Sequence, residues 1–185
     1  MSLSHSMRPP EVIVAITALA AALAMMVAEL KRSRRNEREL RHGGAVEPEG
    51  DVYRAMAFVY PAVFVVMAIE GALFGPATNP ILFAGFVVFI GAKLLKLWAI
   101  AALGSRWSFR VLVLPGIALV SSGPYAYLRH PNYVAVLGEI GGFAMIVGAP
   151  VTGIVSLLVF GALVRRRIAI EEKALGLNAG SRLKA

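Results

Sequence analysis

The sequence contains no cysteine, which excludes disulfide bonds and thiolate metal sites. His5, His42 and His130 lie far apart in the chain and show no metal-ligand spacing, so no metal site is predicted. Charged residues are also scarce, at 16% of the chain, whereas water-soluble domains average roughly 25%. With 58% hydrophobic residues, the chain is too apolar for a single water-soluble core, and its composition indicates a membrane protein.

Acidic residues are fewer than basic ones, 11 against 19, and the net charge is +8. Such a charge can indicate nucleic-acid binding. Here, however, the basic residues cluster at the ends of apolar segments, where side chains face anionic lipid headgroups. The lipid bilayer is therefore the predicted partner, and no nucleic-acid partner is predicted.

Five apolar segments follow one another along the chain, and a helix that crosses the hydrocarbon core needs about 20 such residues. They are Val12–Leu30, Tyr53–Phe74, Ile81–Leu103, Tyr133–Ala149 and Val151–Val164. The last is short but could continue as a helix through Arg165–Leu175. We therefore predict an all-α fold, an integral membrane bundle of about five transmembrane helices, in which the turn at Pro150 makes the last two an antiparallel hairpin.

Lysine and arginine residues follow the first, third and fifth apolar segments, whereas the connection Gly75–Pro80 and the turn at Pro150 have none. Basic loops lie predominantly on the cytosolic side of a membrane. The alternation predicts an N-terminus outside the cell and a C-terminus in the cytosol.

Two motifs carry the chemistry. "GPYAYLRHPNY" occupies Gly123–Tyr133, and "RIAIEEKAL" occupies Arg167–Leu175. In this order, and separated by roughly 30–40 residues that fit two tightly joined helices, they resemble the isoprenylcysteine carboxyl methyltransferase family. The resemblance covers about Trp107–Leu175. It divides the chain into an N-terminal transmembrane region, residues 1–104, and a methyltransferase motif region, residues 105–185.

The resemblance implies an integral membrane enzyme that uses S-adenosyl-L-methionine at the cytosolic face and takes a lipophilic acceptor from the bilayer, in a bacterial plasma membrane. "RVLVLPGIALVSSGPYAYLRHPNY" also resembles a bacterial branch of the family often associated with type III polyketide synthases. Members of that branch O-methylate long-chain polyketide products such as alkylpyrones. We therefore favour a polyketide-type hydroxyl over a prenylcysteine-like carboxyl as the acceptor.

The residue types in the motifs suit this cofactor, which has a carboxylate, an ammonium, a sulfonium and a flat adenine. Arginine and histidine can hold the carboxylate through charge-assisted hydrogen bonds, and glutamates can hold the ammonium or the ribose hydroxyls. Tyrosine rings can face the adenine or the sulfonium, a cation–π contact of about 0.5–2 kcal/mol. The predicted cofactor-binding residues are Tyr125, Arg129, His130, Tyr133, Glu171 and Glu172.

Each assignment has a structural alternative. Arg129 could be an interfacial anchor, the tyrosines could form an aromatic belt, and His130 could cap a helix. Glu171 and Glu172 could pair with basic residues one helical turn away. Among "RRR", we assign Arg167 to catalysis, where it would orient the acceptor's oxyanion, because it alone matches the second motif; the two preceding arginines are interpreted as a cytosolic stop signal.

Glu139 lies inside the fourth apolar segment, where a carboxylate costs about 2.5–3.5 kcal/mol and is functional by default. A hydroxyl acceptor must lose a proton, and Glu139 could be the general base. The alternative is an ion pair with Lys93 or Lys96, which share a helix face.

Two other function classes remain possible from the sequence. One is a sterol-reductase-like enzyme that uses NADPH, because such enzymes resemble this family near their C-terminal ends. The other is a non-enzymatic structural membrane protein. The chain also departs from the family at its end, where "GLNAGSRLKA" replaces an aromatic-rich segment.

Overall fold

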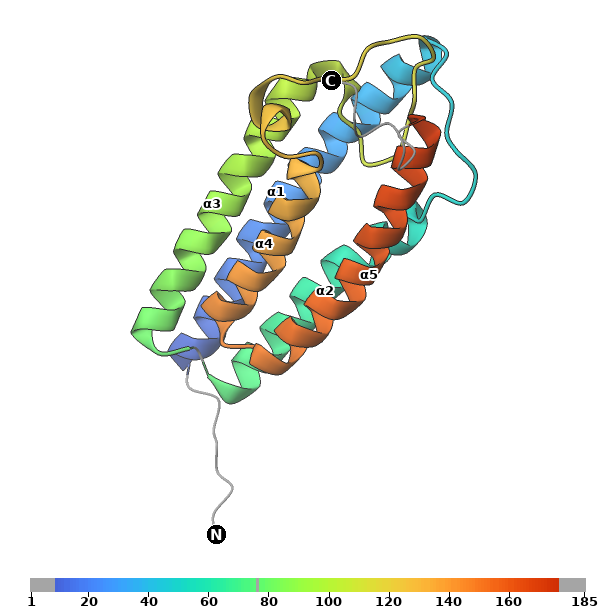
Figure 1. Cartoon of the computed structure of the whole chain (residues 1–185). Coiled ribbons are helices and arrows are strands. Elements are labelled where there is room, and N and C mark those ends of the chain that lie inside the picture. Colours follow the sequence, from blue (N-terminus) through green and yellow to red (C-terminus); the bar gives the residue numbers. More distant parts are fainter. Residues whose placement is uncertain (1–8, 76, 177–185) are drawn as a thin grey trace.

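Five α-helices run alongside one another in the computed structural model, which describes residues 9–75 and 77–176 (Figure 1). They are α1 (Pro9–His42), α2 (Tyr53–Phe74), α3 (Asn79–Leu103), α4 (Pro131–Val147) and α5 (Pro150–Ala174), with 3-10 turns η1 (Gly104–Arg106) and η2 (Gly123–Ala126) in the long loop after α3. Within the described ranges, extended pairing is limited to one bridge, between Val46 and Val113. The all-α prediction is confirmed.

The helices agree closely with the apolar segments of the sequence. The second segment coincides with α2, whereas α1 continues past Leu30 through the basic stretch to His42. Three helices, α1, α2 and α3, are long and apolar enough to cross a membrane, and α4 is a shorter apolar helix. The N-terminus, predicted to lie outside the cell, and the basic residues after Gly176 fall beyond the described residues.

The turn between α4 and α5 is as tight as predicted. Gly148 adopts a left-handed conformation after the last turn of α4. Pro150 is the first residue of α5, where proline is well tolerated because a backbone N–H at this position has no partner within the helix. The carboxylate of Glu70, on α2, accepts hydrogen bonds from the N–H groups of Val151 and Thr152 at 3.1 and 2.7 Å. These bonds satisfy free donors at the start of α5 and join the hairpin to α2.

Helices α3 and α4 approach each other closely because glycines lie at their interface. A Cβ atom on Gly142 would lie 2.6 Å from the backbone nitrogen of Phe89, and one on Gly85 would lie 2.6 Å from Cβ of Met145. Small residues permit this approach between membrane helices, where packing rather than water exclusion drives association. The close pair holds α4, which carries much of the predicted site.

The bundle has a buried aromatic core and an apolar exterior. Phe64 lies 4.7 Å from Phe143 between ring centres, and both are fully buried. By contrast, Phe58, Phe83 and Leu158 are largely exposed on the outer faces of their helices. An exterior this apolar is suited to lipid. Figure 1 shows the long loop and the α1–α2 linker together at one end of the bundle, and the α4–α5 turn at the other.

Candidate functional site

The first motif forms a turn that leads directly into α4. Its opening residues make η2, and Pro131 then occupies the first helical position. Pro131 fixes its own φ and disfavours a helical conformation for His130, so α4 begins at Pro131, two residues before the predicted apolar segment. His130 is thereby held at the entrance of the helix, and Tyr133 lies within its first turn.

The second motif lies on the last turns of α5 and meets the first. The histidine Nε2 atom of His130 lies 3.3 Å from Oε1 of Glu172, and the guanidinium of Arg129 reaches the same oxygen at 3.4 Å. The hydrogen bond with His130 lowers the pKa of the Glu172 carboxyl, and Arg129 lowers it further. Two segments about 40 residues apart in sequence therefore share one charged cluster.

A continuous hydrogen-bonded chain runs through the cluster. The hydroxyl of Tyr133 donates to Oε2 of Glu171 at 2.6 Å and accepts from Nε of Arg167 at 2.8 Å. Arg167 is 5% exposed, whereas Arg165 and Arg166 point outward and are exposed. The burial separates one arginine of the triplet from the other two, in agreement with the sequence motif.

Asp51 also contacts Arg167, although the sequence analysis did not predict it as a site residue. Its Oδ1 atom lies 3.2 Å from Nη1 of Arg167, and the carboxylate also accepts from the backbone N–H groups of Tyr53 and Val111, at 3.1 and 3.2 Å. The carbonyl of Phe109 accepts a further hydrogen bond from Arg167. The linker before α2 and the loop after α3 therefore both hold the guanidinium of Arg167 in place.

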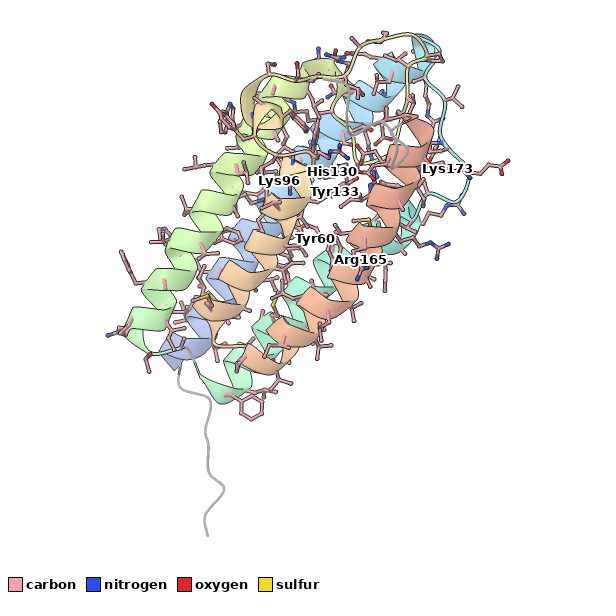
Figure 2. All side chains as sticks on the ribbon, viewed as in Figure 1. Tyr60, Lys96, His130, Tyr133, Arg165 and Lys173 are labelled. Atoms are coloured by element: carbon pink, nitrogen blue, oxygen red, sulfur yellow. The ribbon has the colours of Figure 1, made fainter. Side chains whose placement is uncertain are left out.

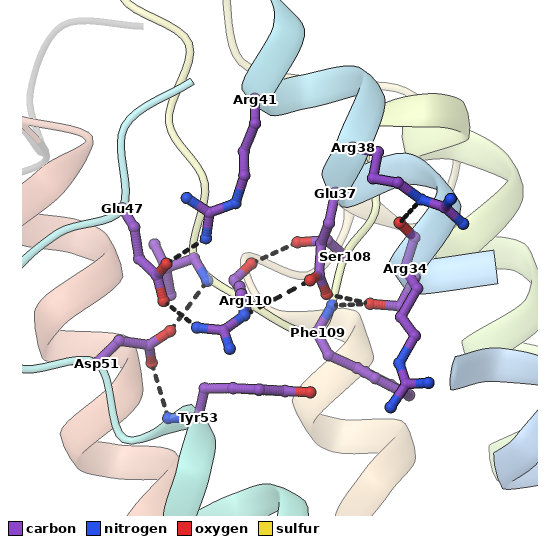
Figure 3. Close-up of polar contacts among 12 residues, drawn as sticks. Arg34, Glu37, Arg38, Arg41, Glu47, Asp51, Tyr53, Ser108, Phe109 and Arg110 are labelled. Carbon is purple, nitrogen blue, oxygen red and sulfur yellow. Dashed lines mark hydrogen bonds and ion pairs between the residues drawn. The ribbon is translucent and has the colours of Figure 1, made fainter. Parts of the chain in front are cut away.

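These two segments are themselves tied to the end of α1, as Figure 3 shows. Glu47 lies 2.5 Å from Nη2 of Arg41 and 2.6 Å from Nη1 of Arg110. Burial alone would raise the pKa of Glu47, but the hydrogen bonds from these two arginines lower it. The ion pairs make the linker and loop a cap over one end of the bundle.

Tyr125 lies near the same cluster without a side-chain hydrogen bond among the described residues. Burial raises the pKa of its hydroxyl, and the negative charge of Glu171 raises it further. Six of the eight predicted site residues are thus joined by direct contacts: Arg129, His130, Tyr133, Arg167, Glu171 and Glu172. Tyr125 lies beside them, and Glu139 lies elsewhere.

A cavity of about 530 Å³ opens below the cluster, within the usual range for small-molecule sites. Its walls are mainly apolar side chains of α1, α2, α4 and α5, such as Leu23, Met26 and Phe160. Arg167 and Tyr133 contribute to its lining, so the charged cluster and the apolar cavity are adjacent. Arg167 can therefore contact both a polar ligand on one side and an apolar one on the other.

Glu139 belongs to a buried ionic network in the helical bundle. Nζ of Lys93 lies 3.0 Å and Nζ of Lys96 lies 3.3 Å from its carboxylate, as the ion-pair alternative predicts. The same two lysines contact Glu29 of α1 at 2.8 and 2.7 Å, and the hydroxyl of Tyr60 donates to Glu139. Four formal charges cancel in this network, which suits a low-dielectric environment where unpaired charges are costly.

The charged cluster fits the cofactor that the motifs imply. Arg129 and Glu172 keep 57% and 29% of their side chains exposed, and their contacts exceed 3.2 Å, so a zwitterionic amino-acid group can exchange for the pair. Asn132 supplies a second observation. Its Oδ1 atom is buried and has no hydrogen-bond partner among the described residues, yet Asn132 lines the cavity. A buried acceptor of this kind is available for a donor from a ligand or a water molecule.

The arrangement defines a helical membrane protein with a two-sided site, one side ionic and the other apolar. Residues 83–177 match the Isoprenylcysteine carboxyl methyltransferase (ICMT) family, and the chain belongs to this family of integral membrane methyltransferases. The match begins earlier than the motifs alone indicate, within α3.

Two bacterial relatives extend the similarity over most of the chain. The uncharacterized protein YpbQ of Bacillus subtilis (strain 168) is 29% identical over 157 residues, which are 85% of this chain and 94% of the relative. An uncharacterized protein of Haemophilus influenzae is 26% identical over 84% of this chain and 91% of its own length. The similarity is therefore longer than the motif region, residues 105–185, alone.

Proposed function

We propose that the protein transfers a methyl group from S-adenosyl-L-methionine to an oxygen atom of a lipophilic acceptor. The observation that carries this proposal is the position of Arg167. Its guanidinium is hydrogen-bonded to Tyr133 within the ionic cluster and also lines the 530 Å³ apolar cavity. A group so placed can contact an acceptor's oxygen while the cofactor occupies the neighbouring cluster.

When bound, the cofactor supplies a methyl group on a positively charged sulfur. In the proposed complex Arg129 and His130 bind its carboxylate, and Glu171 and Glu172 bind its ammonium or ribose. Tyr125 and Tyr133 present ring faces to the adenine or the sulfonium.

Arg167 neutralises the attacking oxyanion and keeps it in line with the methyl group. Alignment of this kind can contribute roughly 7–11 kcal/mol to a group-transfer reaction. The buried contacts of Arg167 with Asp51 and the Phe109 carbonyl support this role, because they fix the guanidinium before an acceptor arrives.

The acceptor is proposed to be a long-chain molecule with a polyketide-type hydroxyl. The apolar walls of the cavity suit an alkyl chain, and the buried carboxylate of Glu139 offers a destination for the hydroxyl's proton. A carboxylate acceptor, the prenylcysteine-like alternative, would need no such group. Glu139 is therefore retained as the proposed general base, in addition to its ion pairs with Lys93 and Lys96.

We propose that the reaction takes place at the cytosolic face of a bacterial plasma membrane. Basic residues concentrate at the end of the bundle that carries the cap, for example Arg38, Arg41 and Arg110, as cytosolic loops require. The cofactor is soluble in water and made inside the cell, which agrees with an ionic cluster on that side.

Calorimetric titration of the purified protein in detergent tests the proposal. S-adenosyl-L-methionine should bind at one saturable site, and NADPH should not. Binding of NADPH alone would favour a reductase, and binding of neither would favour a structural membrane protein.

A further inference from the structure

Glu139 has no direct path to an acceptor in the cavity. Its side chain is fully buried, and it does not line the cavity. Two of its partners, Tyr60 and Lys96, do line it. Figure 2 shows both in the same stretch of the bundle as Tyr133, with Tyr60 farther than His130 from the end that carries the cap. Any proton that reaches Glu139 from the cavity must therefore pass through one of these two side chains.

Tyr60 has the geometry that such a transfer requires. Its hydroxyl donates its hydrogen to Oε2 of Glu139, which leaves the oxygen's lone pairs available to accept a hydrogen bond from the cavity. Lys96 cannot accept a hydrogen bond while it is charged, and its Nζ atom lies 2.7 Å from Glu29 and 3.3 Å from Glu139. A proton donor in the cavity can thus be received by Tyr60 and not by Lys96.

The position of Tyr60 is fixed by its neighbours on three helices. Its ring lies 5.1 Å from that of Phe64 and 5.3 Å from that of Phe160, and Nζ of Lys96 lies 5.3 Å from the ring centre. Pro61 follows it within α2 and has no N–H for the carbonyl of Ala57, so the helix leaves that carbonyl without its usual partner beside the cavity. The part of the wall formed by Ala57, Tyr60 and Pro61 therefore carries polar groups within a cavity that is mainly apolar.

We propose that Tyr60 is a catalytic residue, which takes the proton from the acceptor's hydroxyl as it passes its own proton to Glu139. This inference rests on the proposed function. The O–H bond of the acceptor breaks and a new O–H bond forms on Tyr60, while the original Tyr60 O–H bond breaks and one forms on Oε2 of Glu139. The acceptor's oxygen then bonds the methyl group, and the electron pair of the methyl–sulfur bond returns to sulfur.

Electrostatics offset part of the cost of moving a proton next to Lys93 and Lys96. The network of Glu29, Lys93, Lys96 and Glu139 is neutral as a whole before the transfer. Protonation of Glu139 makes it positive by one unit, next to an acceptor that has become negative. Opposite charges attract strongly in a low-dielectric interior, so the network stabilises the oxyanion as it forms.

A chromogenic probe tests the relay without cofactor. An alkyl-substituted 4-nitrophenol changes its absorbance when it ionises, so its bound protonation state can be followed against pH. The wild type should hold the probe as the phenolate at lower pH than in solution. Tyr60→Phe keeps the aromatic ring and all four ion pairs but removes the relay oxygen, so its bound probe should need a higher pH than in the wild type. Other charged or titratable groups line the cavity unchanged in both proteins: Arg34, Tyr53, Lys96, Tyr133 and Arg167.

Single-turnover methylation of the same probe provides the second measurement. Tyr60→Phe should lower the rate per folded molecule by about 10²–10⁴, the usual contribution of a general base, and the loss should shrink as pH rises. Tyr127→Phe is the matched control, because that tyrosine is 82% exposed, and its rate should equal the wild type. Should Tyr60→Phe fold poorly, a fluorinated tyrosine at position 60 keeps the ring and hydroxyl and should move the pH profile to lower pH.

Equal ionisation curves for wild type and Tyr60→Phe, or equal single-turnover rates, would overturn the relay. An unshifted pH profile for the fluorinated protein would overturn it as well. Failure of the wild type to bind the probe would also overturn the relay, because the relay needs a hydroxyl in this cavity. Cofactor binding measured calorimetrically in the same preparation reports on the proposed function separately.

Discussion

Arg167 donates a hydrogen bond from Nε to the hydroxyl of Tyr133 at 2.8 Å, and this contact joins the two sequence motifs. The bond crosses from α5 to α4, the two arms of the hairpin. The hydroxyl of Tyr133 also donates a hydrogen bond to Glu171, whose carboxylate is proposed to bind the cofactor. The buried arginine and the ionic cluster are therefore fixed relative to each other by one tyrosine.

The ionic cluster should bind the cofactor through His130 and Glu171. His130→Ala and Glu171→Ala should each weaken S-adenosyl-L-methionine binding roughly 10- to 100-fold, because a hydrogen bond to a charged group contributes about 1.5–3 kcal/mol. Calorimetry measures the affinities. Glu49→Ala, an exposed linker carboxylate, is the control and should bind like the wild type. Unchanged affinity in both site variants would remove these residues from the cofactor site.

The network around Glu139 should respond to charge balance. Glu139→Gln leaves two buried lysines with one carboxylate, and an unpaired buried charge costs about 3–5 kcal/mol. Adding Lys93→Met restores neutrality without altering the cavity lining, so the double variant should be more stable than Glu139→Gln alone. Thermal unfolding in detergent provides the comparison. A double variant less stable than either single variant would contradict the ion-pair arrangement.

Helices α3 and α4 should separate if their glycine contact is filled. Gly142→Ala places a methyl group 2.6 Å from the backbone nitrogen of Phe89 and should destabilise the protein by about 1–3 kcal/mol, the usual cost of overpacking. Gly161→Ala is the control, because nothing lies within 4 Å of the added carbon on α5. It should be neutral or stabilising by about 0.4–1 kcal/mol. Equal thermal shifts for both variants would contradict the close packing.

The orientation can be tested directly because the sequence has no native cysteine. Single cysteines at Thr78, beside the start of α3, and at Ser122, in the cap loop, should react with an impermeant reagent from opposite sides of the membrane. The reagent should reach position 122 only after the cytosolic side is opened. Labelling of both positions from one side would rule out the predicted topology.

The local features of the fold could be predicted from sequence, because they depend on nearby residues. Hydropathy located all five helices, and Pro150 located the turn between α4 and α5. The motif residues also met as the family resemblance implies. Each of these predictions depends on spacing along the chain or on a resemblance to known patterns.

The missed residues depend on which helix faces meet, which spacing does not reveal. Asp51 lies in the polar linker between the first two apolar segments, and nothing in its spacing indicates its contact with Arg167. Tyr60 reads as one more aromatic residue in an apolar segment. Among the missed residues, Glu29 had the clearest signal of membership in the ionic network, because it is a carboxylate in an apolar segment like Glu139. Two glutamates and two lysines, Lys93 and Lys96, within apolar segments balance in charge, and this balance would have indicated the network.

Transfer of a labelled methyl group is the direct test of the proposed O-methyltransferase activity and of the role of Arg167. Purified protein is incubated with methyl-labelled S-adenosyl-L-methionine and a bacterial lipid extract, and label in the organic phase is counted before and after alkaline hydrolysis. We expect alkali-stable label for the wild type and for Arg165→Lys, and a loss of about 10- to 100-fold for Arg167→Lys, which keeps the charge but removes the forked hydrogen bonds. Organic-phase label that is equal in Arg167→Lys and the wild type, or absent from the wild type, would contradict this expectation.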